Sequence, residues 1–137
     1  MTAIVLDSSV ALSWCFEDEA SPEMDAIYDR IRDDGGVVPT LWHGEVANVL
    51  LQAEKRGRIG ATAVAARLEA LAQLPITIDV ETPTRAWGAI IVLARTEGLT
   101  TYDATYLDLA MRLGLPLATN DRALADAARR ASVPVLP

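Results

Sequence analysis

The sequence has little of the chemistry that builds disulfides or thiolate metal centres: it contains one cysteine, Cys15, and one histidine, His43, among 137 residues. A single cysteine excludes an internal disulfide, and the two residues together exclude metal centres made of several cysteines or histidines. Any metal site in this chain therefore needs oxygen ligands. We expect Cys15 to be a small apolar residue of the core.

Long apolar runs are missing as well. No run approaches the roughly 20 residues that span a bilayer, and residues 1–7 have neither the basic stretch nor the apolar length of a signal peptide. We therefore expect a cytoplasmic protein with no membrane contact. The chain also lacks repeats and linker-like stretches, so we expect a single domain over residues 1–137. Because 51% of the residues are hydrophobic, that domain can form its own core.

Positive charge is scarce: 12 Lys and Arg face 19 Asp and Glu, which gives a formal net charge of -7. Such a chain has no general attraction to a polyanion, so nucleic-acid binding would need local basic groups. All the bases except Lys55 are arginines, which suit bidentate contacts to phosphate but can equally reflect a GC-rich genome. The basic stretch Lys55–Arg58 either contacts phosphates or stabilises a helix end through its dipole.

Apolar runs and helical spacing of apolar residues predict alternating strands and helices. The predicted strands are residues 3–6, 37–38, 76–78, 117–118 and 133–136. The predicted helices are residues 8–15, 22–34, 42–56, 62–74, 83–97, 102–113 and 121–131. Parallel neighbours need crossover connections, which are usually helical and right-handed. The alternation therefore predicts an α/β fold, a parallel sheet flanked by helices on both faces.

For some residues of the predicted helices, the sequence is compatible with more than one environment. Residues 90–93 are apolar nearly all round their helix, which indicates burial or a subunit contact. Asp108 and Arg112 are spaced as an i,i+4 ion pair, worth about 0.3–0.5 kcal/mol if it is exposed. The three tryptophans are expected in the core or at an interface rather than as stacking platforms for bases: Trp14, Trp42 and Trp87.

Four acids stand directly after predicted strands or at the start of predicted helices: Asp7, Glu45, Asp103 and Asp121. In a parallel sheet such positions share one edge, where ligands bind. Singly, each acid is also explained as a helix N-cap or a dipole-favoured acid. Together they would repel unless a cation neutralised them, and Mg²⁺ and Mn²⁺ prefer carboxylate ligands. Such a site can activate water for displacement at a phosphodiester.

The sequence also resembles a known family. The resemblance rests on Val5–Ser9 (VLDSS), Glu45–Leu50 (EVANVL), Tyr102–Leu107 (YDATYL) and Gly114–Asp121 (GLPLATND). In this order and spacing, the segments resemble PIN-domain ribonucleases, most closely the VapC-type toxins of bacterial toxin-antitoxin pairs. The resemblance covers nearly the whole chain.

The resemblance has implications for fold, activity and partners. It implies a five-stranded parallel sheet, a Mg²⁺ or Mn²⁺ site, cleavage of RNA, a homodimer, and inhibition by a small VapB-like antitoxin in a heterotetramer or larger assembly. By position, Asp7, Glu45, Asp103 and Asp121 correspond to the acidic quartet of the family, with Ser9 and Thr119 at its supporting hydroxyl positions. Asn48 and Asn120 are candidates for additional polar contacts.

Two residues near the acids have structural alternatives. Ser9 either orients the metal or a water by hydrogen bonding or caps its helix, and both can hold together. His43 lies two positions before Glu45, about 200° round the helix, so one helix cannot aim both at one ion. We therefore expect His43 to be structural.

Other functions fit the sequence less well. Phosphatases of the haloacid-dehalogenase type need a second aspartate two positions after the first, where this chain has Ser9. Receiver domains need a lysine after a late strand, and the only lysine, Lys55, is in the middle of the chain. A non-catalytic PIN-fold interaction module is a third alternative, against which the complete quartet argues.

The predicted antitoxin needs a docking place. Apolar residues on helices near the amino end exceed what a thin helical layer need bury: Trp14, Phe16, Met24, Ile27 and Trp42. We therefore expect a groove that an amphipathic partner helix covers. The acidic site would also attract an arginine of the partner, which would compete with the metal.

Overall fold

The computed structural model describes residues 2–137 and contains a five-stranded sheet in the order β3-β2-β1-β4-β5. All four strand pairs are parallel. The strands are β1 (Ile4–Leu6), β2 (Gly36–Pro39), β3 (Ile76–Asp79), β4 (Leu117–Ala118) and β5 (Val135–Leu136). The predicted α/β fold is thus confirmed, with the number of strands that the family resemblance implies.

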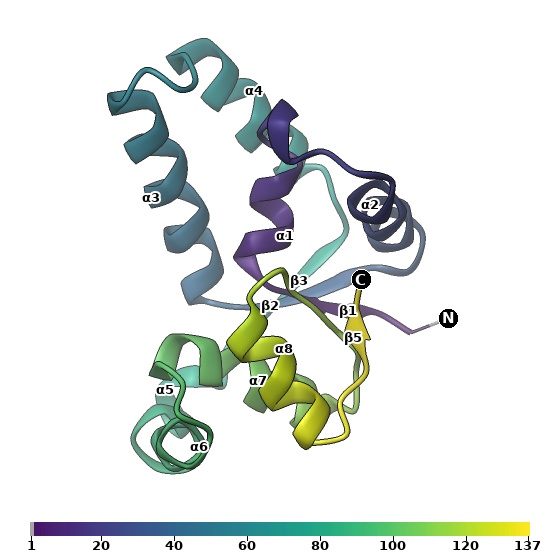
Figure 1. The fold of residues 1–137 in the computed structure, drawn as a ribbon, viewed down its shortest axis with the longest axis vertical. Helices are drawn as coiled ribbons and strands as arrows, with labels where there is room; N and C mark the ends of the chain where they lie inside the picture. Colours follow the sequence, from purple (N-terminus) through teal and green to yellow (C-terminus); the bar gives the residue numbers. More distant parts are fainter. Residues whose placement is uncertain (1) are drawn as a thin grey trace.

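The helices form two layers. Before β3 lie α1 (Ser8–Ser13), the 3₁₀ turn η1 (Glu17–Glu19), α2 (Pro22–Asp34), α3 (Leu41–Lys55) and α4 (Ala61–Ala72). After β3 lie α5 (Thr82–Arg85), the π-helical segment η2 (Ala86–Ile90), α6 (Ile91–Glu97), α7 (Thr101–Leu113) and α8 (Arg122–Arg130). Figure 1 shows α1 to α4 on one side of the sheet and α5 to α8 on the other. In the described residues, no helix has the length and apolar character needed to cross a membrane.

The strand order explains these layers and indicates where a ligand would bind. The chain steps from β1 to β2 and β3 in one direction, and it then returns past β1 to β4 and β5. Because crossovers are right-handed, the two directions place their helices on opposite faces. The chain therefore leaves the adjacent strands β1 and β4 toward opposite layers. Ligands bind in the crevice that such a switch opens outside the carboxyl ends of the strands.

The core forms around β1, whose residues Ile4, Val5 and Leu6 are completely buried. Most apolar residues of the helices pack against this strand and its neighbours in one large cluster, and a second, small cluster consists of Ile90, Ala94 and Ala104. This packing makes the predicted amino-terminal groove wrong for Met24 and Ile27, whereas Trp14 and Phe16 do line a hollow beside α2. Four of its five residues are only 4–6% exposed: Phe16, Met24, Ile27 and Trp42.

Trp14, the fifth residue of that expected groove, is partly buried. Its indole N–H donates a hydrogen bond to the carbonyl of Met24 at 2.9 Å, and its ring packs edge-on against Tyr28. The apolar residues of α1 and α2 are buried because these elements cover the sheet directly. The sequence showed more apolar residues near the amino end than a thin helical layer needs. It did not show that packing on the sheet would bury most of them.

The helix predicted for residues 83–97 is divided into α5, η2 and α6. In a regular α-helix, Arg85 and Ile90 would lie about 140° apart on the helix surface. The π-helical segment, with its i→i+5 bonds, brings them to a common side. Accordingly, Arg85 binds Asp108 and Ile90 packs against Ala104, both on α7.

Two further differences concern burial and length. Ile90 is buried, but Ile91 and Val92 are 38% and 55% exposed, so packing within the chain does not bury all of residues 90–93. The last strand begins two residues later than predicted, because the Val133 amide donates to the Ala128 carbonyl at 2.8 Å and so ends α8.

Candidate functional site

The four predicted acids are carried by both layers and by the centre of the sheet. Asp7 directly follows β1, and Asp121 follows β4 at the start of α8. Glu45 lies on α3, which follows β2, and Asp103 lies in the first turn of α7. The strand register pairs Leu6 with Ala118, so the segments that follow β1 and β4 begin side by side.

Asp7 is 4% exposed and is held by two hydroxyl groups. Ser9 donates to Asp7 Oδ2 at 2.6 Å, and Thr119 donates to the same oxygen at 2.7 Å. Each hydroxyl oxygen also accepts a hydrogen bond from a backbone amide. The Asn120 amide donates to Ser9 Oγ at 2.9 Å, and the Asp121 amide donates to Thr119 Oγ1 at 3.0 Å. Since the amides must donate, both hydroxyl protons are directed at Asp7. No side chain in residues 2–137 donates to the other oxygen, Oδ1.

The pKa of Asp7 is raised above its ordinary value. Burial is the main cause, and the negative charge of Asp121 adds to it. The hydrogen bonds from Ser9 and Thr119 act in the opposite direction, because they stabilise the carboxylate. Asp7 stands at the N-cap position of α1, but its side chain makes no capping hydrogen bond. An N-cap role therefore does not explain this acid.

Glu45 has a partner that the sequence reasoning did not identify. The Tyr106 hydroxyl donates to Glu45 Oε1 at 2.5 Å. Burial raises the pKa of Glu45, the Tyr106 bond lowers it, and the charges of Asp7 and Asp103 raise it further. Burial followed by the interaction with Glu45 also raises the pKa of Tyr106, so its hydroxyl remains a donor. The available signal was its position one helical turn after Asp103.

Asp103 has a pKa raised to about 6, first by burial and then by the charges of Asp121 and Asp7. It is not the cap of its helix, because the Thr100 hydroxyl accepts from the Asp103 amide at 3.0 Å and performs that role. Asp121, in contrast, does cap α8, since its Oδ1 accepts from the Leu124 amide at 2.8 Å. The capping explanation thus holds for Asp121 and fails for Asp103.

Comparisons with known proteins agree with this architecture. The sequence matches the PIN domain family over residues 4–130. The chain belongs to the PIN-domain family. No curated protein matched its sequence.

Solved structures share the PIN fold. The crystal structure of PAE2754 from Pyrobaculum aerophilum is similar with a TM-score of 0.72 and 23% identity, over 92% of this chain and 84% of that protein. The crystal structure of FitAcB from Neisseria gonorrhoeae is similar with a TM-score of 0.67 and 19% identity, over 98% of this chain and 96% of that one. PIN domains are generally nucleases and typically bind divalent metal ions, so this chain belongs to a nuclease family.

The acids of this PIN domain fit a hard divalent cation by their chemistry. Each of three carboxylates has its pKa raised partly by other acids, and no basic residue is among the causes: Asp7, Glu45 and Asp103. In residues 2–137, no three His, Cys, Asp or Glu side chains come close enough to form a ready ligand cluster. Mg²⁺ suits this wider arrangement, because it binds through one or two carboxylates and keeps several waters.

In the basic stretch Lys55–Arg58, one arginine, Arg58, is bound to acids of the same chain. Arg58 binds Asp18 and Glu19 at 2.9 Å each, and its guanidinium lies 3.8 Å from the centre of the Phe16 ring. Arg58 is therefore occupied within the chain, and Lys55 and Arg56 remain exposed at the end of α3.

The remaining sequence candidates have other environments. The Asn120 side chain contacts the sulfur of Met24 at 3.3 Å, and only its backbone amide supports the acids. Asn48 is exposed on α3. Cys15 is buried in the core, as expected.

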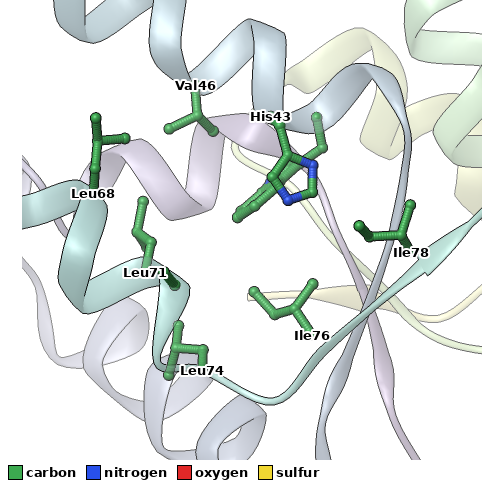
Figure 2. A pocket seen from close by; sticks show the side chains of 9 residues that line it. His43, Val46, Leu68, Leu71, Leu74, Ile76 and Ile78 are labelled. Atoms are coloured by element: carbon green, nitrogen blue, oxygen red, sulfur yellow. The ribbon is translucent and has the colours of Figure 1, made fainter.

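His43 faces an apolar pocket of about 170 Å³ instead of the acids. Figure 2 shows it on α3, opposite Leu68 and Leu71 of α4 and beside Ile76 and Ile78 of β3. None of the four acids lines this pocket. The pocket is therefore separate from the acidic edge, and His43 is not a member of the carboxylate site.

Proposed function

We propose that this PIN domain is a Mg²⁺- or Mn²⁺-dependent endoribonuclease that acts as the toxin of a toxin-antitoxin pair. The observation that carries the proposal is that Asp7, Glu45, Asp103 and Asp121 gather at the carboxyl-end edge of the sheet, where burial and their own charges raise the pKa values of the first three. A site that concentrates negative charge repels RNA until a cation reverses its charge. The acids are therefore better explained by cation binding than by direct RNA contact.

The side chains have distinct roles in this proposal. Asp7 and Asp103 hold the cation, with Glu45 and Asp121 completing its surroundings directly or through water. Ser9 and Thr119 hold Asp7 through its Oδ2, and the Ser8 backbone amide is a further hydrogen-bond partner of this carboxylate. When bound, a divalent cation supplies the positive charge that favours water ionisation and stabilises a phosphodiester under attack.

We further propose that water, rather than the 2′-hydroxyl of the RNA, attacks the phosphorus. Attack by the 2′-hydroxyl is usually served by a nearby general base and acid such as histidine, and His43 lies on the separate apolar pocket. Water attack forms one P–O bond and breaks the bond to the 3′ oxygen, which takes up a proton. The products are then a 5′-phosphate and a 3′-hydroxyl.

The direct test is incubation of total cellular RNA with the purified protein and Mg²⁺, followed by mapping of the cut sites and their end groups. We expect discrete cleavage that EDTA abolishes, with 5′-phosphate and 3′-hydroxyl ends. Asp7→Asn should lose the activity, and Asp25→Asn, an exposed acid on α2, should keep it. Ends with 2′,3′-cyclic phosphate would refute the water mechanism. A folded wild-type protein that does not cleave RNA under any of these conditions would favour the non-catalytic module.

The proposed assembly includes an antitoxin and a homodimer. An arginine from the antitoxin would be attracted to the acids and would compete with the cation for them. Exposed apolar residues on η2 and α6 support a contact between copies: Trp87 at 95%, Ile91 at 38% and Val92 at 55% exposure. Cytoplasmic RNA is the proposed substrate pool.

A further inference from the structure

Tyr106 touches the acidic site from inside the core. Its side chain is completely buried on α7, and its hydroxyl donates to Glu45 Oε1 at 2.5 Å. Glu45 is carried by α3, which lies in the other helical layer (Figure 1). One hydrogen bond therefore joins the two layers beside the edge where the acids gather.

A buried hydroxyl at this position needs an explanation, because taking it out of water costs free energy unless it is hydrogen-bonded. A phenylalanine would fill the same space in the core without that cost. Tyr106 makes its side-chain hydrogen bond to Glu45. The hydroxyl therefore matters for Glu45 more than for the packing of α7.

We propose that Tyr106 is a positioning residue that fixes Glu45 for cation binding; this inference rests on the proposed function. A glutamate side chain has several rotatable bonds and loses much rotamer freedom when it is held in place. Tyr106, enclosed by the core, supplies a rigid donor that selects one Glu45 orientation. Its hydroxyl contacts Oε1, and the Ser8 side chain is a second hydrogen-bonding neighbour of Glu45.

Binding of Mn²⁺ without RNA tests this role by a readout other than cleavage. Tyr106→Phe removes the hydroxyl and keeps the ring, and we expect its Mn²⁺ dissociation constant to rise about 10-fold, the lower end of the range for groups that orient metal ligands. Tyr28→Phe is the matched control, because Tyr28 packs on Trp14 of the amino-terminal helices. Its Mn²⁺ affinity should equal that of wild type.

A double-mutant cycle with Glu45→Gln shows whether Tyr106 acts through Glu45. In the Glu45→Gln background, Tyr106→Phe should cause no further loss of Mn²⁺ affinity, because the ligand that it positions is already gone. Wild-type affinity in Tyr106→Phe, or an equal additional loss in both backgrounds, overturns the positioning role alone. A wild-type protein that binds no Mn²⁺ contradicts the proposed function itself, and the positioning role with it.

Discussion

The Asp7 side chain is buried, accepts from two hydroxyl groups and lies near other acids. We therefore expect it to contribute most to the stabilisation of the fold by a bound metal ion. A cation that binds only the native state at 100 times its dissociation constant adds about 2.7 kcal/mol of stability, which raises the melting temperature by roughly 8 °C for a domain of this size. We expect such a shift with Mn²⁺ in wild type. Asp7→Asn should fold and lose most of it in thermal unfolding scans. The metal assignment is wrong if both proteins show the same shift.

In the metal-free protein, the contribution of Asp103 to the free energy of unfolding falls as the pH rises. Its pKa of about 6 in the folded state lies above the ordinary 3.8, chiefly because of burial. A carboxyl group of this kind stabilises the fold below about pH 4, and this contribution is lost as the pH rises through 6.

Asp103→Asn should therefore stabilise the metal-free protein at pH 7.5 and have little effect at pH 4. We expect a gain of about 1 kcal/mol, because water contact reduces the roughly 3 kcal/mol that the full displacement of the pKa represents. Urea unfolding in EDTA at the two pH values measures this difference. Equal effects at both pH values would show that burial and the neighbouring acids do not raise the pKa of Asp103.

At the scale of elements, α7 is fastened to the rest of its layer by ion pairs. Asp108 is 7% exposed and accepts from Arg85 of α5 at 2.7 and 2.8 Å. Arg112 binds Asp79 at the end of β3 at 2.7 Å and approaches Asp108 at 4.0 Å. The i,i+4 pair that the spacing predicted is thus part of a partly buried network, which fixes the helix carrying Asp103.

Asp108→Asn should lower the free energy of unfolding by about 2 kcal/mol, because it removes the charged acceptor from two partly exposed arginines and leaves a neutral side chain in its nearly buried place. Asp126→Asn is the control. It removes an exposed pair with Arg129 on α8, which contributes about 0–1 kcal/mol. Urea titration of the three proteins at pH 7 gives both values. Similar small losses in the two variants would mean that the network contributes no more than a surface pair.

The sequence predicted elements well where local chemistry decides them and poorly where packing does. Gly98 and Gly114, which adopt left-handed backbone angles, end α6 and α7 as their positions indicated. No local pattern in the sequence predicted the π-helical segment, because its effect is to turn Arg85 and Ile90 toward α7, which is distant in the sequence. An interruption of this kind becomes predictable only when the partner helix is known.

In the candidate site too, the sequence predicted what local position decides and missed what packing decides. Positions after parallel strands predicted that Asp7 and Asp121 share an edge, since the carboxyl ends of such strands lie together. The bond between Tyr106 and Glu45 joins residues 61 apart in the sequence and depends on how two helical layers approach each other. The burial of Phe16 and Trp42 likewise depended on which surface their helices would cover.

For the whole molecule, the proposed activity predicts a growth phenotype. Expression alone should arrest growth, and coexpression with an adjacent small antitoxin should relieve the arrest. Asp7→Asn and Asp103→Asn should each abolish the arrest in a growth assay and still bind the antitoxin in a pull-down. Persistent toxicity of both variants, soluble and folded, would show that the arrest has another origin.

The hydrogen bond between Thr119 and Asp7 spans 112 positions in the sequence. During translation, chains emerge from the amino end and fold as their segments become available. Asp7 leaves the ribosome early, yet Thr119, which follows β4, and the helix that carries Asp103 are made much later. A chain that ends before β4 lacks both Thr119 and Asp121, so the acidic site can form only when synthesis is nearly finished.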